Sequence, residues 1–305
     1  IDGREGTTGL QIYERLSKRG DINLITIPEE LRKDVSARKE RLNAADICFL
    51  CLPDAAARES VSLIENPSVR VIDASTAHRT ADGWVYGLPE LSAERREAVA
   101  RSPRVANPGC HATGFITLVA PLVKGGILGA GYPLTAHSVS GYSGGGKKMI
   151  AEYEAEGRSV LLSSPRQYSL SLSHKHLPEM VKECALSHAP IFNPIVGDFY
   201  CGMCVTVPLY KSLLLKKMGA DDIRNYFAEY YASQNFVKVA KKEEIPAYLP
   251  ANELAGTNLL KIYVSGNDDM ILMCSVFDNL GKGASGAAVQ NMNIMLGLDE
   301  TFSLV

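Results

Sequence analysis

The residue best suited to nucleophilic chemistry is Cys110, which closes the sequence Asn107-Pro108-Gly109-Cys110. A β-type run ends just before it at Val105-Ala106, and an apolar, helix-compatible stretch follows at residues 115–123. The Pro-Gly turn leaves the cysteine at or near a helix N-terminus, where unpaired N–H groups and the helix dipole stabilise a thiolate. With a base nearby, such a thiol becomes a nucleophile. The alternative is a small buried hydrophobic residue, which is the usual role of cysteine.

A base for this cysteine is offered by His174-Lys175-His176-Leu177-Pro178-Glu179. In an extended segment His174 and His176 share a face, and Glu179 can orient an imidazole. The pair can also be half of a metal site, although no further ligand cluster is visible, or a surface pair without a role. His111 is a weaker candidate for the base, because adjacent residues usually point apart. We predict no metal.

A second chemical feature is the glycine-rich turn Gly3-Arg4-Glu5-Gly6-Thr7-Thr8-Gly9, which runs into a stretch of helical periodicity at residues 10–16. Its spacing is G-x-x-G-x-x-G, whereas the commonest dinucleotide fingerprint is G-x-G-x-x-G. The physical effect is the same, because glycines let the backbone approach a diphosphate and the following helix supplies N–H donors. The turn, including Thr7 and Thr8, therefore predicts dinucleotide binding.

The residues after the next predicted strand, at 22–27, favour NADP over NAD. That strand ends Thr26-Ile27-Pro28 without the carboxylate that would hold a ribose 2′-hydroxyl. Three cations follow soon after, at Arg32, Lys33 and Arg38, although Glu29 lies close to the strand end.

Two further segments can bind anions. Gly141-Tyr142-Ser143-Gly144-Gly145-Gly146-Lys147-Lys148 nearly matches a nucleotide-triphosphate loop, but Lys148 stands where a Mg²⁺-binding hydroxyl is needed, so we reject that function. The loop still offers N–H donors and a cation to an anionic substrate, or is a glycine-rich bend. Asp73-Ala74-Ser75-Thr76-Ala77-His78-Arg79 follows a predicted strand, and Arg79 has the planar fork that suits phosphate or carboxylate. An exposed arginine without a role is the alternative.

The elements that must position these groups alternate in the first third of the chain. Strands at residues 46–52 and 69–74 enclose a helix at 54–65, which predicts a parallel sheet with right-handed crossovers. From residue 134 longer β-type runs (134–140, 199–210, 260–264, 270–277) and an amphipathic segment (220–232) predict an α+β domain on a mostly antiparallel sheet. We expect a Rossmann-type α/β domain of residues 1–109 and 283–305, and a catalytic domain of residues 110–282. Ile1-Asp2 resemble the end of a strand that began earlier.

Composition excludes several classes. The 305 residues carry a formal net charge of −2 without Lys/Arg clusters, so nucleic acid and anionic membranes are not expected partners, and no apolar run is long enough to span a membrane. Seven cysteines, an odd number, argue against a disulfide framework and favour a reducing, cytoplasmic compartment. The pairs Cys48/Cys51 and Cys201/Cys204 lie in β-type runs, where residues three apart face opposite sides, so we expect burial in place of zinc.

Taken together, Cys110, the glycine turn, the HKHLPE segment and the final DNLGKGASGAAVQN resemble the semialdehyde dehydrogenase superfamily along essentially the whole chain. Gly109 is typical of its N-acetylglutamyl-phosphate-reducing branch in arginine biosynthesis, whereas the aspartate-semialdehyde branch typically carries a second Asn there. The resemblance implies NADPH-dependent reduction of N-acetylglutamyl 5-phosphate, with release of phosphate, through a thioester on Cys110. It also implies a homo-oligomer, either a dimer or a tetramer.

The resemblance also assigns roles to individual residues. It implies Cys110 as the nucleophile and His176 as the acid/base, with His174 as second choice. Glu179 joins them from the residue pattern alone, as the carboxylate that can orient an imidazole. The predicted cofactor-binding residues are Gly3, Gly6, Thr7, Thr8, Gly9, Ser75, Gly144 and Asn279. The predicted substrate-binding residues are Arg79, Ser143 and Lys147. Between Ser75 and Arg79 this chain has Thr76-Ala77-His78 where the family has A-D-F. Other functions that fit these residues are a related aspartyl- or carrier-linked glutamyl-phosphate reductase, a cysteine hydrolase and a non-catalytic nucleotide sensor.

Overall fold

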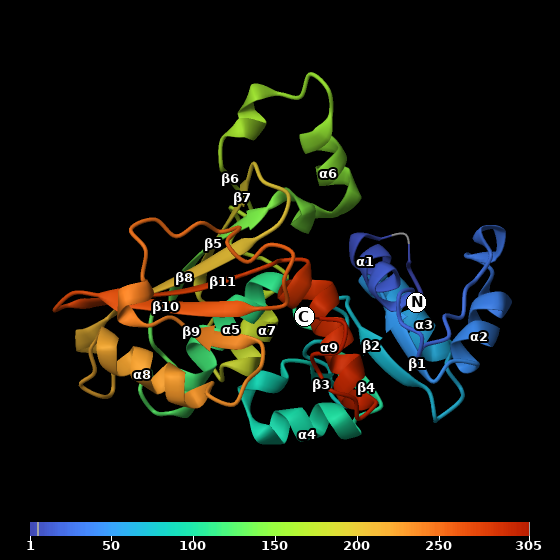
Figure 1. Cartoon of the computed structure of the whole chain (residues 1–305), viewed down its shortest axis with the longest axis horizontal. Helices are drawn as coiled ribbons and strands as arrows, with labels where there is room; N and C mark the ends of the chain where they lie inside the picture. The colour runs from blue at the N-terminus through green and yellow to red at the C-terminus, as the bar shows by residue number, and fades with distance from the viewer. Residues whose placement is uncertain (5, 305) are drawn as a thin grey trace. The chain divides into compact units, whose positions relative to one another are not determined.

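The computed structural model describes residues 1–4 and 6–304, which fold into two units (Figure 1). The first consists of residues 1–109 and 284–305, and the second of residues 110–283. The second crossing between the units therefore falls one residue later than the boundary at 282/283 expected from the sequence. The predicted fold class, a parallel-sheet domain with a mostly antiparallel second domain, is confirmed.

The sheet of the first unit has the strand order β1-β2-β4-β3, and every pair in it is parallel. Parallel strands need a crossover between them, and α3 supplies it between β1 and β2. The strands are β1 (Ile47–Leu50), β2 (Arg70–Asp73), β3 (Val85–Tyr86) and β4 (Arg104–Ala106). The helices are α1 (Thr7–Leu16), α2 (Val35–Asn43), α3 (Asp54–Leu63), α4 (Ala93–Arg101) and the returning α9 (Gly286–Met295).

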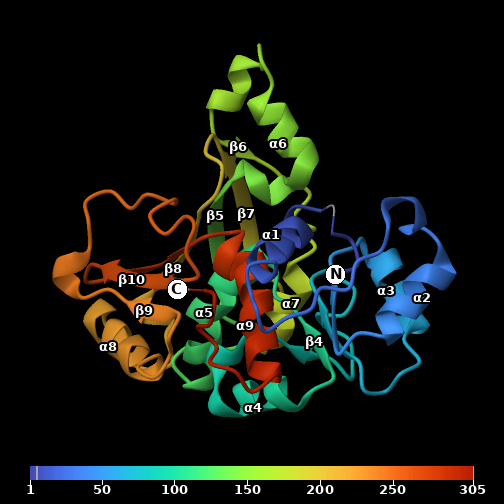
Figure 2. The same cartoon turned by 45° about the vertical axis from the view of Figure 1, so that its right-hand side comes forward.

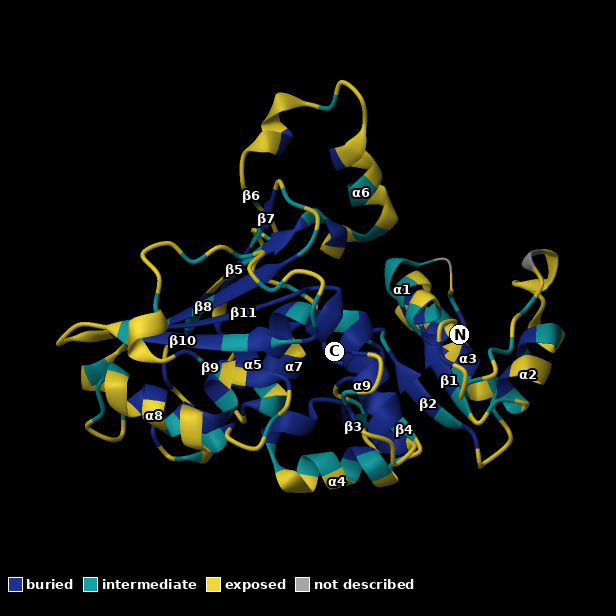
Figure 3. Ribbon diagram, viewed as in Figure 1, coloured by how far each residue is buried: buried dark blue, intermediate teal, exposed yellow. Residues whose placement is uncertain are grey.

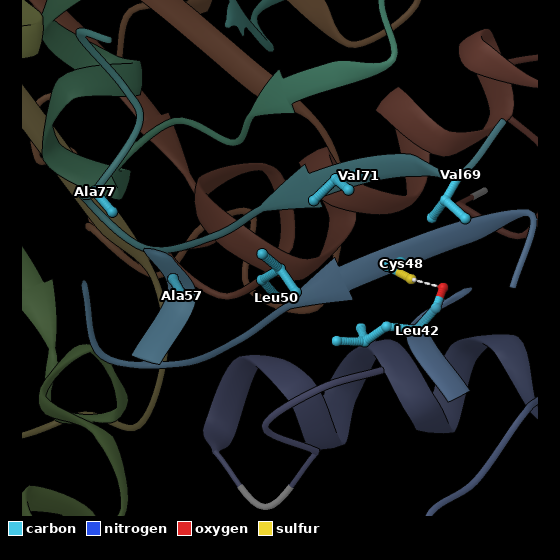
Figure 4. Packing of buried hydrophobic residues seen from close by; sticks show 7 residues of the cluster. All are labelled: Leu42, Cys48, Leu50, Ala57, Val69, Val71 and Ala77. Carbon is cyan, nitrogen blue, oxygen red and sulfur yellow. Dashed lines mark hydrogen bonds between the residues drawn. The ribbon is translucent and has the colours of Figure 1, made fainter. Parts of the chain in front are cut away.

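The core on one face of this sheet explains the register of β1 and β2. Cys48 and Leu50 alternate with Phe49, so they share a face of β1, and Val71 opposes Cys48 on β2 (Figure 4). Leu42 from α2 closes this cluster, and its carbonyl accepts a weak bond from the Cys48 thiol at 3.5 Å. Full burial of a Leu or Val contributes about 1.5–3 kcal/mol, and a register slip of one residue would move the whole set to the opposite face of the sheet.

One predicted strand is wrong. Residues 22–27 form no strand, although their β-type composition favours one. A strand needs a neighbour with unpaired backbone groups, and beyond β1 the described chain offers only Asp2, which makes a single bridge to Leu50. Residues 22–25 line a cavity of about 440 Å³ with Ile1 and Asp2.

The second unit is built on a sheet of order β6-β7-β5-β8-β11-β10-β9, in which only the pairs β5–β7 and β9–β10 are parallel. Helices α5, α7 and α8 lie against one face (Figure 1). The strands are β5 (Thr135–Gly141), β6 (Arg166–Gln167), β7 (Ile191–Gly197), β8 (Met203–Tyr210), β9 (Val237–Val239), β10 (Leu260–Gly266) and β11 (Met270–Phe277). The helices are α5 (Cys110–Lys124), α6 (Gly146–Glu154), α7 (Leu177–Glu183) and α8 (Ala220–Tyr230).

The segment around α6 stands away from this sheet (Figure 2). Its outer surface is exposed, whereas α5 and the central strands β8 and β11 are mostly buried (Figure 3). A 3₁₀ turn, Tyr142–Gly145, separates β5 from α6, so the glycine-rich loop is not the direct strand-to-helix turn of a triphosphate-binding loop. No helix among residues 1–4 and 6–304 is long and apolar enough to cross a membrane.

Candidate active site

Helix α5 begins at Cys110, and the sequence fixes how closely its first turns approach the sheet. A Cβ on Gly114 would lie 2.6 Å from Val205 and 2.7 Å from Ser275, so only glycine permits this distance. The Ser275 hydroxyl then donates to the Gly114 carbonyl at 3.2 Å. The helix is apolar nearly all round and buried, as a helix enclosed by its own domain must be. The predicted position of Cys110 at a helix N-terminus is thus the observed one.

Gly283 lies beside the nucleophile candidate. A Cβ built on it would stand 2.9 Å from the Cβ of Cys110 and 3.1 Å from the Asp278 carbonyl. The residue belongs to a single π-type turn, Gly281–Ser285, a feature found frequently at functional sites. The missing side chain at position 283 therefore leaves room for the Cys110 side chain.

The loop that precedes Cys110 is held by hydrogen bonds within the first unit. Arg79 Nε donates to the Asn107 carbonyl at 3.0 Å, and its Nη2 donates to the Ala74 carbonyl at 3.1 Å. The Asn107 amide donates to the Ala284 carbonyl at 2.9 Å and accepts from Asn291 at 3.2 Å. Two N–H groups of Arg79 thus donate to backbone carbonyls, and its predicted role in substrate binding stays a prediction.

Three imidazole rings cluster in the second unit. One of them belongs to His111, the residue that follows Cys110. The His174 and His176 rings lie 4.7 Å apart between centroids, and His111 lies 5.3 Å from His174 and 5.5 Å from His176. His111 and His176 are buried, and His174 is half-buried. Sequence reasoning selected His174 and His176 but underrated the proximity of His111.

His111 is tied through both ring nitrogens. Its Nδ1 lies 2.7 Å from the Ser138 hydroxyl and its Nε2 lies 2.7 Å from the Tyr168 hydroxyl. Burial lowers the pKa of His111 to about 3, so the ring is neutral at physiological pH. Burial also raises the pKa of Tyr168, and the charge of nearby Cys110 adds to this effect.

Sequence reasoning missed Ser138 and Tyr168. Ser138 is fully buried on β5, and its alternation with exposed His137 was visible in the sequence. Nothing in the sequence separates Tyr168 from the other tyrosines except its position six residues before His174.

The HKHLPE segment is a turn, not the extended segment that the sequence analysis assumed. His176 has αR backbone angles as the N-cap of α7, and its backbone N–H donates to His174 Nδ1 at 3.1 Å. Pro178 explains the difference, because proline is favoured in the first turn of a helix and so starts α7 directly after the histidines. Glu179 is buried in that first turn, and its role in orienting an imidazole stays a prediction.

The glycine turn of the first unit has the geometry of a diphosphate cradle. Gly3 has φ +84°, and a Cβ there would lie 2.4 Å from the Cys51 carbonyl. A Cβ on Gly9 would lie 2.5 Å from the Gly3 carbonyl, so both positions require glycine. Helix α1 begins at Thr7, whose Oγ1 is buried and has no hydrogen-bond partner among the described residues. Such an orphaned hydroxyl at a helix N-terminus fits an anionic ligand. Glu5 lies outside the described residues.

A cavity of about 500 Å³ opens beside this turn. Arg32 and Lys33 line it, as does residue 4. Arg38, which the sequence grouped with Arg32 and Lys33, does not line this cavity. Its guanidinium donates to Asp2 at 3.0 Å and to Ser60 at 2.7 Å. Asp2 and Arg38 are both buried, and a buried charge needs a partner, so the pair is part of the structure of the first unit.

Ser75 is held in a local network within the first unit. Its hydroxyl donates to Asp73 at 2.8 Å and accepts from the Ala77 N–H at 3.1 Å. Asp73 also binds His78 Nδ1 at 2.6 Å, and the His78 ring stacks on Trp84. A cofactor would therefore meet the backbone or an already engaged hydroxyl at Ser75, and its cofactor role stays a prediction.

Three predicted ligand-binding residues meet in the second unit. Asn279 donates to the Ser143 hydroxyl at 3.0 Å and accepts from the Gly202 N–H at 2.8 Å. A Cβ on Gly144 would lie 3.5 Å from the Asn279 amide nitrogen. Lys147 lies exposed on α6. Among the residues that the structure describes, no group of three or more His, Cys, Asp or Glu side chains could hold a metal ion.

The chain combines a glycine cradle at the start of α1 with a cysteine at the start of α5. Together with the clustered imidazoles of the second unit, these features define a class of two-domain proteins that bind a dinucleotide and use a cysteine as the reactive group. Comparison with known proteins gives the family. Residues 3–99 match the semialdehyde dehydrogenase NAD binding domain, and residues 110–279 match the semialdehyde dehydrogenase dimerisation domain. The chain belongs to the semialdehyde dehydrogenase family.

Relatives of known function cover the whole chain. A Mesorhizobium japonicum protein named N-acetyl-gamma-glutamyl-phosphate reductase is 50% identical over 305 residues, covering 98% of each chain. A Nostoc protein named N-acetyl-gamma-glutamyl-phosphate reductase 2 is 46% identical, covering 100% of this chain and 98% of its own. Aspartate semialdehyde dehydrogenase II from Vibrio cholerae shares the fold, with a TM-score of 0.70 over 97% of this chain but 16% identity.

Proposed function

We propose that this protein reduces N-acetyl-γ-glutamyl phosphate to N-acetylglutamate 5-semialdehyde and phosphate in arginine biosynthesis. The observation that carries the proposal is the full-length identity of 46–50% with reductases of that name. The aspartate enzymes share the fold at 16% identity, which supports the same architecture and nothing more specific.

We assign the cofactor as NADPH. The Gly3 and Gly9 positions, which exclude any side chain, and the orphaned Thr7 hydroxyl fit the cofactor diphosphate. Arg32 and Lys33 in the adjoining cavity would pair with a ribose 2′-phosphate. When bound, the reduced cofactor supplies the hydride that brings the acyl group to the aldehyde level.

Cys110 is assigned as the nucleophile. Its thiolate attacks the acyl carbon, the bond to phosphate breaks, and a thioester remains on Sγ. After reduction, the tetrahedral thiohemiacetal expels the thiolate and the semialdehyde leaves. Helix α5 begins at Cys110, and we assign the backbone N–H groups of its first turn to the oxyanion of each tetrahedral species.

The imidazole cluster is assigned the proton transfer. A base removes the thiol proton before attack, and an acid donates a proton to the developing alkoxide during reduction. His176 is the first candidate and His174 the second. Ser143 and Lys147 are assigned to bind the anionic groups of the substrate. Arg79 is also assigned to bind the substrate, while its Nε keeps the hydrogen bond to the Asn107 carbonyl.

The match to a dimerisation domain supports a homo-oligomer, which we propose to be a dimer or a tetramer. The other proposed partners are the acyl phosphate, the semialdehyde and inorganic phosphate. The cytoplasmic location stays a prediction from cysteine usage.

The test is the reverse reaction with NADP and phosphate. We expect oxidation of N-acetylglutamate semialdehyde to exceed that of aspartate semialdehyde. Faster turnover of the aspartate compound would assign the chain to the sister activity, and absence of NADP(H) binding would leave a cysteine hydrolase.

A further inference from the structure

We infer that His174 is a fixed hydrogen-bond donor that orients the substrate and exchanges no proton during turnover, so that His176 is the only acid/base of the imidazole cluster. This inference rests on the proposed function and separates two residues that the sequence leaves interchangeable.

The first observation is the bond from the His176 backbone N–H to His174 Nδ1, at 3.1 Å. A backbone N–H can only donate, so Nδ1 must present its lone pair. A neutral imidazole carries one proton, which is then on Nε2. Whatever His174 Nε2 meets, it meets as a donor.

The same bond opposes protonation of the ring. A proton on Nδ1 would point at the N–H of His176 across 3.1 Å and would break the bond. That N–H belongs to the N-cap of α7, directly before the first helical turn, which contains Pro178. His174 can therefore gain a proton only if the turn before α7 opens. It cannot serve as an acid from Nε2 either, because a neutral imidazole does not release that proton near neutral pH.

His111, the third ring, is excluded as the acid/base for a different reason. Both nitrogens of His111 are engaged at 2.7 Å, by Ser138 and Tyr168, and the ring is buried. Its proton count is set by two hydroxyl groups and does not change with the reaction. His176 is the member of the cluster that remains.

Neutral neighbours also suit His176 chemically. Its neighbours include the His174 ring at 4.7 Å and the His111 ring at 5.5 Å, with Lys175 beside it in the chain and Glu179 in the first turn of α7. An imidazolium at His176 would be repelled by a second one at either ring. If His174 and His111 stay neutral, His176 can gain and lose a proton without that penalty.

Two matched substitutions test the roles of the two ring nitrogens of His174 separately. His174→Asn keeps an acceptor for the N–H two residues on, as in an Asx turn, but loses the far donor. His174→Gln keeps a donor near the Nε2 position but loses the acceptor. We expect both variants to keep the histidine limb in the pH profile of kcat, and His174→Asn to raise KM for the semialdehyde about 5- to 10-fold. His176→Gln should lower kcat about 10²- to 10⁴-fold and remove that limb.

Unchanged NADPH affinity serves as the folding control for all three variants. The inference is overturned if either His174 variant loses the pH limb or if His176→Gln keeps it.

A readout independent of activity is ¹⁵N NMR of histidine-labelled protein between about pH 5 and 8. We expect His174 Nδ1 to stay unprotonated over the whole range, and titration of that nitrogen would overturn the inference. Absence of any reductase activity in the unmodified protein would refute the proposed function while leaving the NMR result standing.

Discussion

The starts of helices α1 and α5 use the same physical device in two different ways. Both follow a turn that contains glycine, and in both the first backbone N–H groups point out of the helix end, where its dipole is positive. The start of α1 is left incomplete, with an orphaned Thr7 hydroxyl and a cavity of about 500 Å³ beside the turn. At α5, Gly283 packs against Cys110, and hydrogen bonds from Arg79 and Asn291 hold Asn107 in the loop before it.

This difference indicates what each helix start is for. A reversible ligand can complete an open cradle, and the protein leaves polar groups there for it. A covalent centre needs its nucleophile held within a narrow geometry before the substrate arrives. Substitutions at the two starts should therefore have separable effects, on cofactor affinity at α1 and on chemistry at α5.

The largest expected effect is that of Cys110→Ser. Because a serine hydroxyl in this position lacks the acidity of a thiol, reductase activity should fall more than about 10³-fold. The affinity for NADPH, measured by fluorescence titration, should be unchanged. Cys204→Ser, at a buried cysteine on β8, is the control and should retain activity. A large loss of NADPH affinity in Cys110→Ser would break the comparison.

Gly283→Ala should have the next largest effect. The new Cβ would stand 2.9 Å from the Cys110 Cβ, so the nucleophile must shift. A displacement of this kind costs about 10²-fold in kcat. Gly131→Ala is the matched control, because nothing lies within 4 Å of the added atom. Steady-state kinetics decide, and equal kcat values for the two variants would contradict the account.

Replacement of Arg32 and Lys33 by alanine should act on the cofactor alone. Loss of two cations that face a 2′-phosphate should weaken NADPH binding about 10-fold or more and leave NADH binding nearly unchanged. The difference between the cofactors should shrink at high salt.

Arg38→Ala is the contrasting variant. It should destabilise the first unit by leaving Asp2 unpaired, which a lower Tm would reveal.

The smallest effect is expected from Thr7→Val, which removes the orphaned hydroxyl but keeps the shape of the side chain. NADPH affinity should fall about 5-fold, the value of one hydrogen bond, while the unliganded protein should be equally or more stable. Calorimetry gives both numbers. Unchanged affinity would mean that the hydroxyl has no ligand to meet.

Local patterns in the sequence predicted much of the fold. Short β-type runs predicted β1 and β2, and the apolar stretch after Cys110 predicted α5, because buried elements are rich in apolar residues over short stretches of the chain. The glycine turn is likewise a pattern within a short stretch. Residues 22–27 failed because a strand depends on a partner that composition does not reveal.

The site was less predictable where partners are distant in the chain. Arg38 looked like a cofactor ligand and is instead committed to Asp2 and Ser60, 36 and 22 residues away. Tyr168 and Ser138 reach His111 across 57 and 27 residues, and no local pattern shows that they meet this ring. The turn at His174 was hidden because two histidines with one residue between them fit a strand as well as a helix N-cap.

The most direct test of the central claim is to trap the acyl group on Cys110. Enzyme is mixed with N-acetylglutamate semialdehyde and NADP in the absence of phosphate, so that the thioester forms, NADPH is released and no phosphate is present to remove the acyl group. We predict one NADPH per active site, an N-acetylglutamyl adduct on the peptide that contains Cys110, and its loss on addition of phosphate. A burst without an adduct, or an adduct on another residue, would contradict the account.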